Sequence, residues 1–141
     1  MDPREVQIAA PDRASRPMRR LALSQGLFYL VTGVWPLVHM RSFEAVTGPK
    51  IDRWLVRTVG GLLGVVGGSL GWAARSGRVS PEIRAIGAGT AAVLAAIDCT
   101  YVARRRISPV YLLDAAVETA LVAGWTVAEL RAPRTPYTSP A

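Results

Sequence analysis

The chain has 141 residues, of which 50% are apolar and 19% charged, and it carries a formal charge of +7. A soluble domain usually has nearer a quarter charged residues and spreads them along its helices. Here the basic residues gather in the N-terminal segment and in short connections, without a basic helix face or an aromatic stacking surface. This distribution fits one membrane domain and argues against a nucleic-acid-binding protein.

Four long apolar runs predict four membrane-spanning helices, at residues 21–40, 54–74, 85–103 and 109–130. At about 1.5 Å per residue, each run is long enough to cross a hydrocarbon core about 30 Å thick, given some help from its flanks. The connections are short, so consecutive helices should lie antiparallel. We therefore expect an all-α integral membrane four-helix bundle with antiparallel, up-and-down connections.

Local signals place several helix ends. Pro36 should bend or end the first span. Ser80 and Ser108 each precede a proline, so each can cap a helix whose first residue is that proline. The longest connection, residues 41–53, holds a Gly-Pro-Lys sequence that predicts a turn.

The two ends of the chain lack an apolar period. Residues 1–20 form a predicted basic arm, and residues 131–141 a flexible C-terminal tail. The arm and the apolar run behind it resemble a signal peptide, but the run is longer than a signal's apolar region and no convincing cleavage site follows. This favours a retained first span.

Aromatic and basic residues bear on the placement in the membrane. Trp and Tyr concentrate at membrane interfaces. Four alternating spans would bring one group near one surface and a second group near the other: Trp35, Trp54, Tyr101 and Tyr111, and Trp72 and Trp125. The side that carries both termini has more Arg and Lys. We therefore expect a multi-pass membrane protein with cytoplasmic termini.

Small residues predict close helix packing, because lipid provides little hydrophobic force between helices. Gly60, Gly64 and Gly68 recur at intervals of four on the second span, and Ala120 and Gly124 lie on one face of the fourth. We interpret these stripes as contacts within the bundle. Contact between copies of the chain is the alternative.

Four ionisable residues lie inside the predicted spans, where charge is expensive and therefore informative: Arg57, Asp98, Asp114 and Glu118. Asp114 and Glu118 are four residues apart, so they share one face of the last helix, with Glu118 near mid-membrane. Arg57 enters from the same surface and is the expected partner. The group is either a binding site or a structural ion pair.

Three further residues could form the rim of such a polar pocket. His39, Arg41 and Arg53 border the first loop, on the side from which the charged residues enter the membrane. Membrane lipids are the expected partners of the basic residues. Other membrane subunits, or further copies of the chain, are the alternatives.

No motif indicates catalysis, a metal or a cofactor. A single histidine and a single cysteine cannot build a zinc site or a disulfide within one chain. The glycines near residue 60 lack the lysine and the preceding strand of a phosphate-binding loop. We expect no catalytic residue, metal or cofactor, and an enzyme is the less favoured class.

Residues 26–71 read GLFYLVTGVWPLVHMRSFEAVTGPKIDRWLVRTVGGLLGVVGGSLG. This apolar helix, proline-bearing exit, short loop and glycine-rich second helix resemble the first half of small four-helix bacterial membrane proteins of the DoxX-like and uncharacterised kind. The resemblance implies a four-helix membrane bundle in a bacterial inner membrane and transfers no active-site residue.

Three functions remain open from the sequence. The first is a membrane-embedded binding or accessory protein, with the polar pocket taking a lipid or a small apolar ligand. The second is a structural subunit of a larger membrane complex, docked through its glycine stripes. The third, an intramembrane enzyme or transporter, has the least support because no inverted repeat accompanies the four spans.

Overall fold

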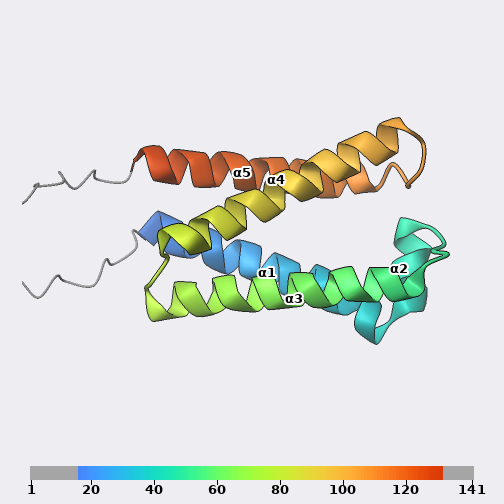
Figure 1. The fold of residues 1–141 in the computed structure, drawn as a ribbon, viewed down its shortest axis with the longest axis horizontal. Helices are drawn as coiled ribbons and strands as arrows, with labels where there is room; N and C mark the ends of the chain where they lie inside the picture. Colours follow the sequence, from blue (N-terminus) through green and yellow to red (C-terminus); the bar gives the residue numbers. More distant parts are fainter. Residues whose placement is uncertain (1–15, 132–141) are drawn as a thin grey trace, which may run out of the picture.

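The computed structural model describes residues 16–131, and within them the chain is entirely helical apart from short connections (Figure 1). Five helices follow in order: α1 (Arg16–Val38), α2 (Met40–Thr47), α3 (Arg53–Ser76), α4 (Pro81–Ala103) and α5 (Tyr111–Leu130). All but α2 are long and apolar enough to cross a membrane. The prediction of an all-α, multi-pass membrane protein with four antiparallel spans is confirmed.

The helix ends differ in detail from the predicted ones. α1 begins at Arg16, so residues 16–20 of the predicted arm are helical, while residues 1–15 and 132–141 lie outside the described part. Ser80 caps α4 as expected, its Oγ accepting from the Ile83 N–H at 3.4 Å. Ser108 does not cap α5: its Oγ accepts from the Val110 N–H, and a turn precedes the helix at Tyr111.

The helix α2 was not predicted, because it lies in the segment expected to be a loop. His39 caps it, with Nδ1 accepting from the Ser42 N–H at 3.2 Å. Trp35 of α1 donates from Nε1 to Ser42 Oγ at 2.7 Å. Gly48 ends the helix with a φ of 87°, a value that favours glycine. α2 follows α1 after a single residue and lies at the end of the bundle opposite the start of α1 and the end of α5 (Figure 1).

Helices α1 and α3 are in backbone contact. A Cβ atom at Gly33 would lie 2.6 Å from the carbonyl oxygen of Gly60, and one at Gly26 would lie 2.7 Å from that of Gly67. Both distances are too short for real atoms. Gly26 and Gly33 are seven residues apart on α1, as are Gly60 and Gly67 on α3. These glycines allow the two helices to approach more closely than side chains would permit.

The predicted packing stripes only partly coincide with this contact. Gly60 lies in it, but a Cβ at Gly64 or Gly68 would meet nothing within 4 Å. Ala120 is exposed, and Gly124 lies against the side chain of Leu21. A repeat of four drifts around a helix, so only some members of such a stripe can face one neighbour.

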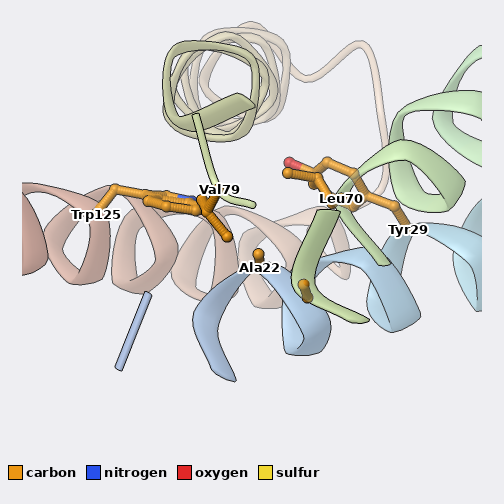
Figure 2. Close-up of a cluster of buried hydrophobic side chains, with 6 residues drawn as sticks. Ala22, Tyr29, Leu70, Val79 and Trp125 are labelled. Atoms are coloured by element: carbon orange, nitrogen blue, oxygen red, sulfur yellow. The ribbon is translucent and has the colours of Figure 1, made fainter. Parts of the chain in front are cut away.

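The spans form two closely packed pairs, α1 with α3 and α4 with α5, which touch each other less extensively. An apolar cluster joins the pairs in the half of the bundle nearer the termini; its buried members are Ala22, Tyr29, Leu70, Ala74, Val79 and Trp125. Figure 2 shows Trp125 beside Val79, and Leu70 beside Tyr29. Beyond this cluster, polar side chains connect the pairs.

Candidate functional site

A buried polar network connects α1 to both helices of the other pair. Gln25 donates from Nε2 to the Tyr29 hydroxyl at 2.9 Å and to the carbonyl oxygen of Gly87 in α4 at 2.8 Å. Its Oε1 accepts from Trp125 Nε1 in α5 at 2.7 Å. One amide side chain therefore bonds to three helices, and Gln25 is fully buried.

Tyr29 extends the network to the centre of α5. Its hydroxyl donates to Glu118 Oε2 at 2.8 Å, so it accepts from one neighbour and donates to the other. Glu118 is 0% exposed, and its second oxygen, Oε1, has no hydrogen-bond partner among the described residues. Buried carboxyl oxygens nearly always have a partner, so this one requires an explanation.

The other two predicted carboxyls lie nearer the α4–α5 connection: Asp114 is one turn before Glu118 on α5, and Asp98 lies in the last turns of α4. Asp98 of α4 and Asp114 of α5 lie next to each other, and both lie near Glu118. Asp98 is 6% exposed, and its Oδ2 has no partner within residues 16–131. We call Asp98, Asp114 and Glu118 the carboxyl cluster.

The expected pairing with Arg57 is wrong. Arg57 is exposed on α3, whereas the carboxyl cluster lies between α1, α4 and α5. The two salt bridges of the described residues, Arg53–Glu44 and Arg84–Glu129, do not involve the cluster. The sequence places Arg57 on the correct surface, but the face of a helix depends on its packing, and the glycines of α3 turn another face towards α1.

The three predicted rim residues are exposed at the end of the molecule that carries α2. His39 serves as the cap of α2, and Arg53 binds Glu44 through two hydrogen bonds, of 2.9 and 2.7 Å. Lys50 lies over the ring of Tyr111, 4.9 Å from its centroid, and so ties the α2–α3 connection to α5. None of these contacts involves the carboxyl cluster.

The stability of the α2–α3 connection should depend on pH through the carboxyl group of Glu44. The hydrogen bonds from Arg53, followed by that from the Lys50 N–H, lower the pKa of Glu44 below its ordinary value. A lowered folded-state pKa stabilises the connection above the ordinary pKa of glutamate, and this stabilisation is lost as the pH falls through the lowered pKa. Hydrogen exchange of the Lys50 amide should therefore lose protection in acid, whereas Glu44→Gln should show no such step. Equal profiles for the two proteins would contradict this assignment.

Three residues of the network were missed by the sequence analysis: Gln25, Tyr29 and Trp125. A signal existed for the first two, since an amide and a phenol four residues apart on an otherwise apolar run share one helix face. Trp125 was interpreted as an interfacial residue, but it is buried and donates to Gln25. Polar residues without charge can thus be as informative within a span as ionisable ones.

The surface has a shallow groove next to the network. It lies between α4 and α5, measures about 400 Å³, and is lined by Trp125 and Ala88 together with residues nearer the termini. A second groove, of about 690 Å³, runs between α3 and α4 past Gly68 and Trp72. Neither of these two grooves is lined by the carboxyl cluster. Among the described residues, no group of histidine, cysteine and acidic side chains is suited to a metal ion.

Comparison with known proteins does not extend this description. No protein-family model matches the chain, and neither the curated proteins nor the solved structures include a significant match. The resemblance to the DoxX-like proteins therefore has no support beyond the four helices. What is established is a small multi-pass helical membrane protein with a buried polar network between its helix pairs.

Proposed function

We propose that the chain is a small membrane-embedded binding protein whose carboxyl cluster holds the polar head of a lipid or of another small apolar ligand. The observation that carries the proposal is Glu118, which is fully buried near the middle of α5 and keeps one oxygen unpartnered among the described residues. Asp98 offers a second such oxygen. Polar groups left open at this depth are expensive and mark sites more often than they stabilise a fold.

The chemistry of the cluster indicates the kind of head group. An ionised carboxylate only accepts hydrogen bonds, and the Tyr29 hydroxyl already uses its proton on Glu118. The open positions therefore suit a donor such as a hydroxyl or an ammonium group. The limited contact between the two helix pairs supports entry of such a molecule sideways from the lipid.

Glu118→Gln tests the proposal. A glutamine has nearly the same shape and can still accept from Tyr29, but its amide replaces an acceptor with a donor. We expect wild type, extracted gently from its native membrane, to retain a small molecule in native mass spectra, and Glu118→Gln to lose it while keeping its thermal midpoint. Glu44→Gln makes the same chemical change outside the spans and should retain the molecule.

Two outcomes would overturn the proposal. If Glu118→Gln retains the molecule as well as Glu44→Gln does, the cluster is not the site. If Glu118→Gln instead falls apart in mild detergent while Tyr29→Phe, which also removes the bond between the two residues, does so too, the network only stabilises the bundle.

A structural subunit of a larger membrane complex is the second candidate, and the glycines of α3 favour it. Gly64 and Gly68 lie four residues apart with open space above them, so they leave a smooth surface on a span. Such small-residue surfaces let another helix approach closely. Gly68→Leu should then dissociate the complex, whereas Val65→Leu, at an exposed neighbouring position, should not.

The placement of the protein follows from its charges. Both ends of the bundle carry arginines. Residues 1–15 and 132–141, which adjoin α1 and α5 in the sequence, contain further arginines. We therefore propose that the termini are cytoplasmic, as the positive-inside rule favours, and that the membrane is a bacterial inner membrane. An intramembrane enzyme or transporter would draw on the same three carboxyls and has no separate support.

A further inference from the structure

A basic groove lies at the end of the bundle nearer the termini, well away from the carboxyl cluster. It measures about 360 Å³ and runs between the first turns of α1 and the last turn of α3; its lining consists of Arg16, Arg19, Arg20, Leu23, Ala74 and Arg75. Two different helices therefore bring four arginines to one hollow.

One arginine is held in place by the fold. Arg19 donates from Nε to the carbonyl oxygen of Ala74 at 3.0 Å, which fixes its guanidinium against the end of α3. Its terminal nitrogens form no hydrogen bond with the described residues. All four arginines are exposed, and neither salt bridge within residues 16–131 neutralises any of them.

The position of the groove relative to the membrane limits what can occupy it. Its arginines lie at the ends of two membrane-spanning helices, at the level of the lipid head groups, and Leu23 continues the groove towards the apolar part of α1. Guanidinium groups bind phosphate through paired hydrogen bonds, and basic residues beside a span attract anionic lipids. A phosphate group with an acyl chain attached fits this groove, because the phosphate would meet the arginines and the chain would meet Leu23.

We propose that this basic groove binds the phosphate of an anionic phospholipid, as a site separate from the carboxyl cluster. The ligand chemistry is a phosphate ester, which a lipid or a soluble molecule could supply. The apolar continuation at Leu23 favours the lipid.

The test uses the full chain in detergent and two triple variants of equal charge. R16Q/R20Q/R75Q removes three arginines from the groove and leaves Arg19 in its contact with Ala74. R104Q/R105Q/R106Q removes three exposed arginines from the opposite end. Native mass spectrometry then measures retention of phosphatidylglycerol and of phosphatidylcholine with the same acyl chains.

We expect wild type and R104Q/R105Q/R106Q to retain phosphatidylglycerol in preference to phosphatidylcholine. R16Q/R20Q/R75Q should bind phosphatidylglycerol about tenfold or more weakly. Equal losses in the two variants, or no loss in either, would overturn the proposal, since binding would then follow net charge or another surface. If R16Q/R20Q/R75Q does not fold, Arg75→Gln alone should still weaken binding several-fold against Arg105→Gln.

A competition experiment with a soluble phosphate ester distinguishes a lipid from a soluble ligand. Glycerol phosphate at the concentration of the lipid should not displace phosphatidylglycerol from wild type. Displacement would mean that the groove takes a soluble phosphate ester, and the lipid proposal would be wrong. None of these results depends on Glu118, so the two sites are tested independently.

Discussion

We expect Gly67→Ala to lower the free energy of unfolding by about 1–3 kcal/mol. A methyl group at Gly67 would lie 2.7 Å from the Gly26 carbonyl oxygen and 2.9 Å from the Leu30 nitrogen. Both atoms belong to the backbone of α1, so neither can move aside without shifting the helix. The change should therefore separate α1 from α3, the closest pair in the bundle.

The next residue provides the control. A methyl group at Gly68 would meet nothing within 4 Å, and alanine is preferred over glycine inside a helix by about 0.5–1 kcal/mol. Gly68→Ala should thus leave the free energy of unfolding unchanged or raise it. Equilibrium unfolding in mixed micelles measures both variants. If they behave alike, α1 and α3 do not meet through their glycines.

Gln25→Leu should have an effect of similar size, about 2 kcal/mol or more, although it adds apolar surface within a membrane protein. Leucine removes hydrogen bonds to Tyr29, to the Gly87 carbonyl and to Trp125. The buried indole N–H would then have no acceptor in its place. Because Gln25 joins α1 to α4 and α5, the loss should loosen one helix pair from the other.

Ser24→Leu is the matched control, since it makes a polar-to-leucine change at the adjacent, exposed position of the same helix. It should leave the unfolding transition in place. Tryptophan fluorescence should also shift in Gln25→Leu, because Trp125 loses its buried partner, and should stay unchanged in Ser24→Leu. A stable Gln25→Leu protein would mean that apolar contacts alone hold the pairs together.

The spans could be predicted from the sequence because their signal is additive. Many apolar residues in a row indicate a helix in lipid whatever its neighbours are, and a Ser-Pro pair marks a helix start from local chemistry alone. Thus the start of α4 at Pro81 was found directly. At Ser108 the same signal is followed by a turn, and α5 begins only at Tyr111. Local sequence does not distinguish such a turn from the first turn of a helix.

The site was harder to predict because it depends on which face each helix turns inward. Asp98, Asp114 and Glu118 were expected to gather, and the structure places them together. Arg57 was expected to join them and is instead exposed on α3. Its direction is set by the contact of Gly60 and Gly67 with α1, and that contact needs the two glycines of α1, which do not stand out in the sequence.

Helix α2 shows a different limit. It has only eight residues, and its stability depends on contacts with residues outside the helix. These are the cap from His39, the hydrogen bond between Trp35 and Ser42, and the edge-to-face packing of Trp35 on Phe43, with ring centroids 5.6 Å apart. A short helix has little intrinsic stability. Its formation therefore follows from tertiary contacts that a scan for long periodic runs does not detect.

Carbodiimide labelling followed by peptide mapping tests the central claim, a carboxyl site within the membrane that a small apolar molecule can reach. In intact membranes, dicyclohexylcarbodiimide, which partitions into lipid, should modify Glu118, Asp98 or Asp114. A water-soluble carbodiimide should leave these three unmodified and react with Glu129, whose side chain is 57% exposed at the end of α5. Labelling of the three by the water-soluble reagent only, or by neither reagent while Glu129 reacts, would contradict the account.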